Sequence, residues 1–409
     1  MIKEKISKFL SPELKMWIRS FKVKSYLRGV KKVDPEMLDG CTRGVNIFGH
    51  IRGDFGLGES CRLLASAVKA SGVPYAIINV PHIPAASETN TDWILEETHD
   101  QPYGINLIHI NPMELVSSIK DIPKEVWSQH YNIAFWLWEL PEFPPEWDYL
   151  IDIFDEIWTP SDFVSDAIRK RTDKRIVTIP YGIAKSVTDD KYDRAFYRLP
   201  DDKYLYLMSF DGKSNFERKN PLGSIQAYKR AFPKEVSQVG IVIKATNISA
   251  DEREFLMREF DGYKNVYILE ETLSKTQFNS LLKSCDCYIS LHRSEGFGLV
   301  LAECMMLDTI VVATRWSANV EFMDDESSVL VDTHIIELDR EYPPYHKGAH
   351  WAEPDIDMAA KKIRQIYDDE ALRKKIIDGA RQKVSECLSI DRAAQLVKAR
   401  IDEIYRGDI

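Results

Sequence analysis

The chain has 409 residues, of which 44% are hydrophobic and 29% are charged, and its formal net charge at pH 7 is −10. This length exceeds one ordinary hydrophobic core and suits two globular domains of roughly 150 to 200 residues each. The negative net charge argues against a nucleic-acid-binding protein. No apolar run approaches the roughly 18 residues of a membrane-spanning helix, and the N-terminus lacks the apolar core of a signal peptide.

The six cysteines lack the spacing of a disulfide framework. Their apolar or helical contexts are typical of reduced thiols, which predicts a cytoplasmic protein. Cys285 and Cys287 alone supply too few ligands for a zinc site, so packing beside a buried strand is the better interpretation.

Residues 1–40 are predicted to form a separate basic segment. Residues 1–32 hold ten Lys or Arg and two Glu, a net charge of +8, so the remaining chain carries −18. Apolar residues recur among the lysines at three- and four-residue spacing, which predicts an amphipathic helix bent at Pro12. They are Ile6, Phe9, Leu10, Leu14, Trp17, Ile18 and Phe21. Either this helix lies on an anionic membrane surface, or it packs on the first domain with its lysines in solvent.

The predicted first domain, residues 41–190, opens with a strand at 45–50 and a helix at about 59–71. Gly56 and Gly58 lie in the loop between them. A glycine loop that leads from a strand into a helix lets a phosphate approach the free N–H groups of the helix. The alternative is a tight turn that binds no ligand.

Further strands of this domain are predicted at 73–80, 105–110, 131–139, 154–159 and 176–181, with Ser161 as the N-cap of a helix. His109 ends one of these strands and is a candidate catalytic residue, the alternative being a structural histidine with satisfied hydrogen bonds. Trp138 and Glu139 end the aromatic strand. They could offer an acceptor sugar a stacking platform and a hydroxyl acceptor, or they could pack in the core.

Charged residues at 184–202 are predicted to be a linker, and residues 203–390 to form the second domain. Its first strand, at 204–210, is followed by Arg218 and Lys219 at the start of a helix at 221–231. Arg supplies a planar bidentate donor and Lys a mobile point charge, which together suit a diphosphate. The alternative is an ordinary basic pair on the surface. Two more strands are predicted at 239–244 and 266–269.

The most informative stretch combines a strand at 287–291, a polar turn, a helix at 297–306 and a β-branched strand at 309–313. Glycines in the turn let the backbone approach a ligand, and the first N–H groups of the helix would point at an anion. The turn residues concerned are Gly296, Phe297, Gly298 and Leu299.

Two carboxylates, Glu295 and Glu303, bracket this turn. Together with the N–H groups they suit a ligand that combines phosphate with several hydroxyls, such as a nucleotide-sugar. The alternative is a solvated turn residue and a helix surface charge. The apolar sequence around Glu303 argues against that alternative, because an unpaired buried carboxylate is costly.

Glu295-Gly-Phe-Gly followed by Glu303 resembles the E-x7-E motif of the retaining glycosyltransferases of family 4, which have the GT-B fold. The resemblance extends from about residue 44 to 390. It implies that Glu295 faces the donor sugar, that Glu303 binds the ribose, and that Arg218 and Lys219 grip the diphosphate.

The resemblance also implies that the glycine loop of the first domain lies against the donor diphosphate and that the final helix, residues 391–409, crosses back onto the first domain. Members of that family often carry a catalytic-region histidine at the end of the fourth strand. This chain has Trp136, Trp138 and Glu139 there, and His109 on the neighbouring strand is the substitute candidate.

No metal or cofactor is predicted. Asp355 and Asp357 fit a D-x-D metal motif, but they stand at a predicted helix start, where Asp caps backbone N–H groups.

The predicted fold class is α/β, with two Rossmann-like doubly wound domains that face each other across a cleft. The predicted protein is a retaining glycosyltransferase that moves a hexosyl-type sugar from a nucleotide-sugar to a glycan or lipid-linked glycan for a surface polysaccharide. It would work in the cytoplasm or at the inner face of the membrane.

Three alternatives remain. A catalytically silent nucleotide-sugar-binding protein would keep the fold without the reaction. A dinucleotide-dependent oxidoreductase would want an acidic residue about 20 positions after the glycine loop, and the second predicted strand ends without one. A GT-B phosphorylase would want a lysine motif for pyridoxal phosphate, and none stands out.

Overall fold

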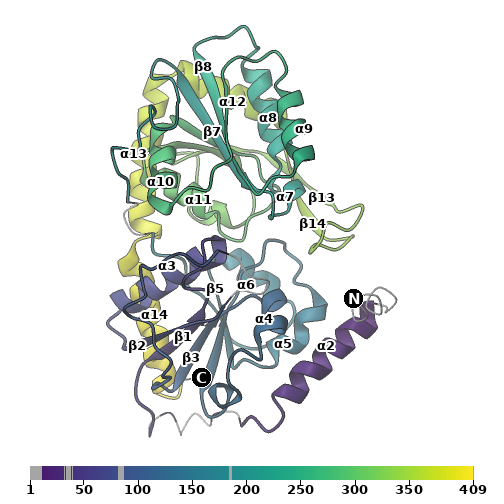
Figure 1. The fold of residues 1–409 in the computed structure, drawn as a ribbon, viewed down its shortest axis with the longest axis vertical. Helices are drawn as coiled ribbons and strands as arrows, with labels where there is room; N and C mark the ends of the chain where they lie inside the picture. Colours follow the sequence, from purple (N-terminus) through teal and green to yellow (C-terminus); the bar gives the residue numbers. More distant parts are fainter. Residues whose placement is uncertain are drawn as a thin grey trace. The chain divides into compact units, whose positions relative to one another are not determined.

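The computed structural model describes residues 12–31, 33, 38, 40–81, 87–183 and 187–408. The chain divides into two compact units, each built around its own sheet (Figure 1). The first unit comprises Met1–Leu137, Phe143–Gly182 and Ile390–Ile409, and the second comprises Trp138–Glu142 and Ile183–Ser389.

The first unit holds a six-stranded parallel sheet in the order β2-β1-β3-β4-β5-β6. Its strands are β1 (Val45–Gly49), β2 (Tyr75–Asn79), β3 (Ile105–His109), β4 (Tyr131–Phe135), β5 (Glu156–Thr159) and β6 (Ile176–Thr178). Every residue of β1, β3 and β4 is buried. Such strands, covered by helices on both faces, read as continuous apolar runs, and for this reason the sequence predicts them well.

Helices cover this sheet on both faces. They are α3 (Gly56–Ala70), α4 (Pro112–Ser118), α5 (Asp148–Ile151), α6 (Asp162–Arg169) and α14 (Ile390–Tyr405). The last helix of the chain, α14, packs beside α3 (Figure 1). Its Arg400 forms a buried ion pair with Glu156 at 2.6 Å, and the Tyr405 hydroxyl donates to the Gly44 carbonyl at 2.8 Å. The C-terminal helix is therefore an integral part of the first unit.

The second unit also holds a six-stranded parallel sheet, in the order β12-β11-β10-β7-β8-β9. Its strands are β7 (Tyr204–Asp211), β8 (Val239–Thr246), β9 (Val266–Leu269), β10 (Cys287–Ser290), β11 (Ile310–Thr314) and β12 (Val329–Val331). The chain proceeds from β7 outward to β9 and then returns to β10 on the other side of β7. The strand order thus reverses between β7 and β10, and ligands of open α/β sheets bind at such a switch point.

The helices of the second unit are α7 (Phe216–Lys219), α8 (Pro221–Ala231), α9 (Ala250–Glu259), α10 (Lys275–Ser284), α11 (Leu299–Met306), α12 (Ile356–Asp368) and α13 (Glu370–Cys387). Side chains of α8, α9 and α12 share one buried cluster with residues of the sheet such as Tyr206 and Ile241. An antiparallel hairpin of β13 (Thr333–Glu337) and β14 (His350–Pro354) extends from this unit.

The prediction of two doubly wound α/β units is confirmed, and each strand named in the sequence analysis exists. The aromatic strand is shorter than predicted: β4 ends at Phe135, and residues 138–142 group with the second unit. Of the predicted linker, residues 184–202, the structure describes residues 187–202. Arg194 in this segment donates to the Ser284 carbonyl at 2.8 Å and to Asp286 at 2.9 Å, which attaches the segment to the second unit.

Helix α2 (Pro12–Tyr26) lies at the edge of the first unit (Figure 1). The predicted residues Ile6, Phe9 and Leu10 lie outside the described part of the chain. The part of this helix that the structure describes begins at Pro12, so the predicted bend at Pro12 also involves residues outside the described part of the chain. None of the helices that the structure describes is long and apolar enough to span a bilayer.

Candidate functional site

Two loops meet at the carboxyl ends of β7 and β10. In the first loop, Asn215 caps α7 by accepting a hydrogen bond from the Arg218 N–H at 2.9 Å. Asn220, which has a left-handed backbone with φ 48°, donates from its side chain to the Leu291 carbonyl at 2.8 Å. These contacts fix the short helix that carries Arg218 and Lys219 against the end of β10.

Glu295, in the second loop, receives both basic side chains. Lys219 Nζ donates to Glu295 Oε1 at 2.6 Å, and Arg218 Nη1 lies 3.3 Å from the same oxygen. The Glu295 and Arg218 side chains are only 13% and 6% exposed, whereas Lys219 is 28% exposed. Burial alone would raise the pKa of Glu295, but Lys219 and Arg218 lower it to about 2. The carboxylate is therefore ionised throughout the physiological range.

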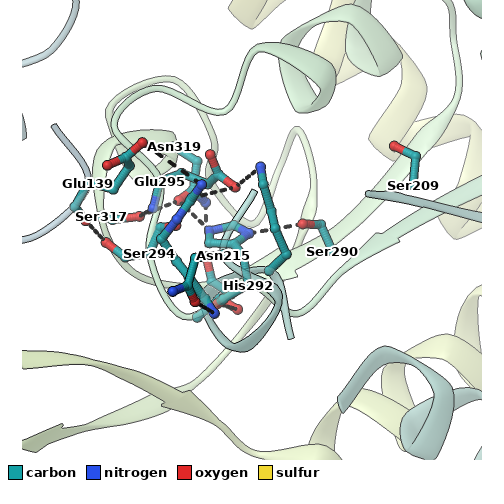
Figure 2. Close-up of polar contacts among 12 residues, drawn as sticks. Glu139, Ser209, Asn215, Ser290, His292, Ser294, Glu295, Ser317 and Asn319 are labelled. Atoms are coloured by element: carbon teal, nitrogen blue, oxygen red, sulfur yellow. Dashed lines mark hydrogen bonds and ion pairs between the residues drawn. The ribbon is translucent and has the colours of Figure 1, made fainter. Parts of the chain in front are cut away.

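Arg218 also connects this loop to the segment 138–142. Its Nη1 donates to the Ser294 carbonyl at 2.7 Å, and its Nη2 lies 3.9 Å from Glu139 Oε1. The Tyr345 hydroxyl, from the loop between β13 and β14, donates to Glu139 Oε2 at 3.1 Å. Figure 2 shows the Glu139 carboxylate beside Ser294 and Glu295. A buried cation thus lies between two carboxylates.

Trp138 is buried, and its ring lies 5.4 Å from that of Tyr345 between centroids. The Trp138 indole N–H donates to the Glu142 carbonyl at 2.8 Å. Its partner in the sequence prediction, Glu139, is 30% exposed. The structure therefore places the Trp138 ring in packing contacts and leaves the Glu139 carboxylate accessible beside Arg218.

His292 is a buried member of this site that no motif marks in the sequence. One ring nitrogen, Nδ1, shares a hydrogen bond with Ser290 Oγ at 3.0 Å, and Nε2 shares one with Asn319 Oδ1 at 3.2 Å (Figure 2). Burial lowers the pKa of His292, and the charges of Lys219 and Arg218 lower it further, while Glu295 acts in the opposite sense. These effects favour the neutral imidazole at a position where it senses the charge of Glu295. Its one signal in the sequence is its place directly after an apolar strand.

Contacts and backbone conformation within the chain itself explain why glycine stands at positions 296 and 298 of the turn. A Cβ atom on Gly296 would lie 2.4 Å from the Trp138 carbonyl oxygen. Gly298 has φ 92°, a conformation that favours glycine, and it precedes the first residue of α11. Phe297 is buried and Leu299 begins the helix. The predicted contact of this turn with an anion stays a prediction.

Glu303 is also buried, with 4% of its side chain exposed, and it forms an ion pair with Lys275. Lys275 is the first residue of α10, so this pair joins the start of α10 to the middle of α11. The apolar surroundings that the sequence predicted for Glu303 are confirmed, and its surface alternative is wrong. Ribose binding by Glu303 stays a prediction.

The remaining predicted residues lie in the first unit. A Cβ atom on Gly58 would lie 2.2 Å from the Gly53 carbonyl oxygen, whereas one on Gly56 would meet open space. His109 is buried, shares a hydrogen bond with Ser60 Oγ through Nε2 at 2.6 Å and stacks on Phe135. Burial lowers the pKa of His109 to about 3. This neutral, hydrogen-bonded state matches the structural alternative, and a catalytic role for His109 stays a prediction.

The D-x-D motif is a helix cap. Asp355 accepts a hydrogen bond from the Met358 N–H at 2.9 Å, and Asp357 pairs with Arg230 at 2.7 Å. Within the described ranges, no three His, Cys, Asp or Glu side chains gather in a way that could hold a metal ion.

Comparisons with known proteins show what the chain is similar to. Residues 191–383 match the family model described as "Glycosyl transferases group 1". No curated protein sequence matches the chain. Among solved structures, HepE of Anabaena in complex with UDP and glucose is 13% identical, with a TM-score of 0.64 over 88% of this chain and 100% of that one.

Two further structures have the same fold. Sucrose-phosphate synthase of Thermosynechococcus elongatus is 14% identical, with a TM-score of 0.64 over 89% of this chain and 100% of that one. A glycosyltransferase of Rickettsia africae is 14% identical, with a TM-score of 0.60 over 89% and 99% of the two chains. The chain therefore has the two-sheet α/β fold of the GT-B glycosyltransferases, and its residues 191–383 match the glycosyl transferases group 1 family model.

Proposed function

We propose that the protein is a retaining glycosyltransferase that moves a hexosyl-type sugar from a nucleotide-sugar to a glycan or a lipid-linked glycan. The observation that carries the proposal is the meeting of Arg218, Lys219 and Glu295 at the switch point of the second sheet. The group 1 domain match and the UDP-glucose complex of the structural neighbour HepE also support a nucleotide-sugar as the donor.

Charge explains why these residues suit the reaction. In sugar transfer the bond between the anomeric carbon and the phosphate oxygen breaks, and its electron pair leaves with the diphosphate. Preorganised cations aimed at that oxygen lower the barrier. Lys219 is partly exposed, and the flexible stem of a lysine lets its ammonium follow the phosphate, while the buried Arg218 pairs with Glu295.

We further propose that the reaction requires no metal, because the same two cations would neutralise the leaving diphosphate. The proposal puts the leaving diphosphate beside Arg218 and Lys219, the two cations that pair with Glu295. Glu295 would then accept hydrogen bonds from the sugar hydroxyls, and Glu303 from the ribose hydroxyls. Gly56 and Gly58 are proposed to face the diphosphate, and Glu139 and Trp138 the acceptor.

For the acceptor, we propose a lipid-linked glycan of surface polysaccharide synthesis, at the inner face of the membrane. Trp17 and Phe21 on α2 are 62% and 55% exposed and stack on each other with ring centroids 5.6 Å apart. The other side of the helix is anchored, since Val23 is buried and the Tyr26 hydroxyl donates to the Ile122 carbonyl at 2.8 Å. Exposed basic residues flank the aromatic pair, at Arg19, Lys22 and Lys24. An anionic bilayer would match both features.

Incubation of the pure protein with a panel of nucleotide-sugars tests the proposed function, with release of the nucleoside diphosphate as the readout. Release from one donor class, abolished in Glu295→Ala, is the expected result. Tight binding of a nucleotide-sugar without any release, with or without glycan acceptors, would instead identify the catalytically silent alternative. Failure to bind any nucleotide-sugar would overturn the proposal.

A further inference from the structure

Ser317, in the loop after β11, has a backbone conformation that residues other than glycine rarely adopt. Its φ is 76° and its ψ is −161°. This region of backbone space is occupied almost only by glycine, and other residues found there are strained and cluster at functional sites. Glycine would adopt the conformation without strain, so the serine side chain needs a role that glycine could not fill.

The Ser317 hydroxyl does not cap its own helix. Ser317 precedes the short 3-10 helix η4 (Ala318–Glu321), and a serine at such a position commonly accepts a hydrogen bond from the first N–H groups, but no such bond forms. The hydroxyl instead accepts the Glu295 N–H at 2.9 Å and donates to Asn319 Oδ1 at 3.3 Å (Figure 2). Ser317 is only 5% exposed, so these buried contacts occupy both the acceptor and the donor of the hydroxyl.

Two fully buried side chains, Asn319 and His292, fix the direction of this hydroxyl. The Asn319 amide N–H donates to a backbone carbonyl at the end of β11 at 3.0 Å, so Asn319 Oδ1 is the acceptor for Ser317 Oγ and for His292 Nε2. The neutral His292 ring therefore carries its proton on Nε2, and its Nδ1 accepts from Ser290 Oγ at 3.0 Å. A chain of hydrogen bonds thus runs from the end of β10 to the backbone of Glu295.

The loop after β11 holds the Glu295 residue by both of its backbone polar groups. Ser317 accepts its N–H, and the Ala318 N–H donates to its carbonyl at 3.2 Å. With the backbone fixed in this way, the Glu295 carboxylate can move only through its own side-chain torsions, and its pairing with Lys219 limits these further. Such preorganisation favours a transition state more than it favours ground-state binding.

We propose that Ser317 is a positioning residue for sugar transfer, whose hydroxyl fixes the Glu295 backbone so that the carboxylate meets the transferred sugar in one orientation. The inference rests on the proposed function, because it takes Glu295 as the residue that faces the donor sugar. It makes the turnover number depend on the Ser317 hydroxyl, whereas the stability of the fold depends on the backbone conformation at the same position. Two substitutions separate these dependences, since glycine and alanine both lack the hydroxyl and only glycine relaxes the backbone.

The experiment compares Ser317→Gly and Ser317→Ala with the wild type and with Arg198→Gly as the control. Arg198 is an exposed residue of the second unit that also has a positive φ, of 56°. Both Ser317 variants should lose at least about tenfold in turnover of the nucleotide-sugar identified by the donor panel, because small misplacements of a reacting group are costly. Calorimetry with the matching nucleoside diphosphate should show unchanged affinity. Ser317→Gly should melt at a higher temperature than Ser317→Ala, the reverse of the usual order, and Arg198→Gly should keep full turnover.

Each other outcome counts against a stated claim. Full turnover in Ser317→Gly would overturn the inference, since a purely structural serine could be replaced there without loss of activity. A nucleotide affinity that falls in step with turnover would also overturn it, because the defect would then extend beyond the sugar. A higher melting temperature for Ser317→Ala than for Ser317→Gly, or failure of Ser317→Gly to fold, would contradict the strained backbone.

The wild type distinguishes this inference from the proposed function. If it releases a nucleoside diphosphate from no donor, the proposed function fails and this inference fails with it. If it turns over a donor and Ser317→Gly does so equally well, only this inference is wrong. Should Ser317→Ala not fold, the turnover number and the nucleotide affinity of Ser317→Gly decide alone.

Discussion

Lys219 Nζ lies 2.6 Å from Glu295 Oε1, so the cation proposed for the diphosphate and the carboxylate proposed for the sugar are direct partners. Arg218 shares the same carboxylate oxygen at 3.3 Å from its buried position. A diphosphate that attracts Lys219 would release part of Glu295 for the sugar hydroxyls. On the proposed function, donor binding and the exposure of Glu295 to the sugar would be coupled through this one ion pair.

Replacement of Lys219 by alanine should lower the turnover number by roughly a hundredfold, the scale of losing one donor to the transition state. Lys213→Ala is the matched control, because Lys213 is an exposed lysine in the same loop after β7. Steady-state rates with the preferred donor measure the effect. Full activity of Lys219→Ala, or complete loss of wild-type activity with a chelator, would contradict the assignment of the leaving-group charge to side chains.

Glu303→Gln should impair nucleotide binding, whereas Glu295→Gln should impair sugar transfer. Glu303→Gln should weaken the binding of the free nucleoside diphosphate by roughly tenfold, as expected for loss of a hydrogen bond to a charged group. Glu295→Gln should bind that nucleotide nearly as well and lose mainly turnover. Calorimetry and kinetics on both variants measure this division. Equal losses of nucleotide affinity in the two variants would speak against it.

The pKa of Glu295 predicts a pH dependence of stability. Its folded value of about 2 lies below its ordinary value of 4.5, so the carboxylate stabilises the fold above that ordinary value. The contribution is lost as the pH falls from about 5 toward 2, with about 1 kcal/mol gone by about pH 3.5.

The free energy of unfolding in urea, measured at neutral and acid pH, tests this dependence. Between neutral pH and about pH 3.5, the difference in unfolding free energy between wild type and Glu295→Gln should shrink by about 1 kcal/mol. Glu254→Gln, at an exposed position of α9, should show no comparable change. A constant difference between wild type and Glu295→Gln would show that the ion pairs do not depress the pKa.

The aromatic face of α2 gives a prediction on membranes. The double variant Trp17→Ser, Phe21→Ser should lose flotation with anionic liposomes at low salt, whereas the wild type floats. The attraction should weaken with salt, because each basic residue near the surface contributes only about 1 kcal/mol. Leu95→Ser is the control, since Leu95 is 96% exposed on the same unit. Equal behaviour of the double variant and the wild type would rule out a membrane role for this face.

Most of the fold could be predicted because both sheets are parallel and covered by helices, which turns their strands into apolar or β-branched runs. The hairpin β13–β14 was not predicted from the sequence. Its two strands are antiparallel, and three of the five residues of β13 are exposed, so no continuous apolar run marks them. The aromatic strand is overestimated because Trp136 and Trp138 continue an apolar pattern after the strand pairing has ended at Phe135.

The basic pair and the two glutamates could be predicted because they stand in local motifs beside a strand end. Tyr345 could not, because it reaches Glu139 across 206 residues of sequence. His292 has its partners Ser290 and Asn319 on two different elements, and only the folded sheet brings them together. The second role of Gly296, to make room for the Trp138 backbone, is likewise a property of the packed chain.

The most direct test of the account is proton NMR of the anomeric signal during turnover of the preferred nucleotide-sugar. With wild-type protein, the nucleoside diphosphate should be released and the transferred sugar should first appear with the anomeric configuration that it had in the donor. Glu295→Gln should leave the donor intact over the same time. A first product of inverted configuration would contradict the retaining reaction. An undiminished rate of donor consumption in Glu295→Gln would show that Glu295 is not part of the active site.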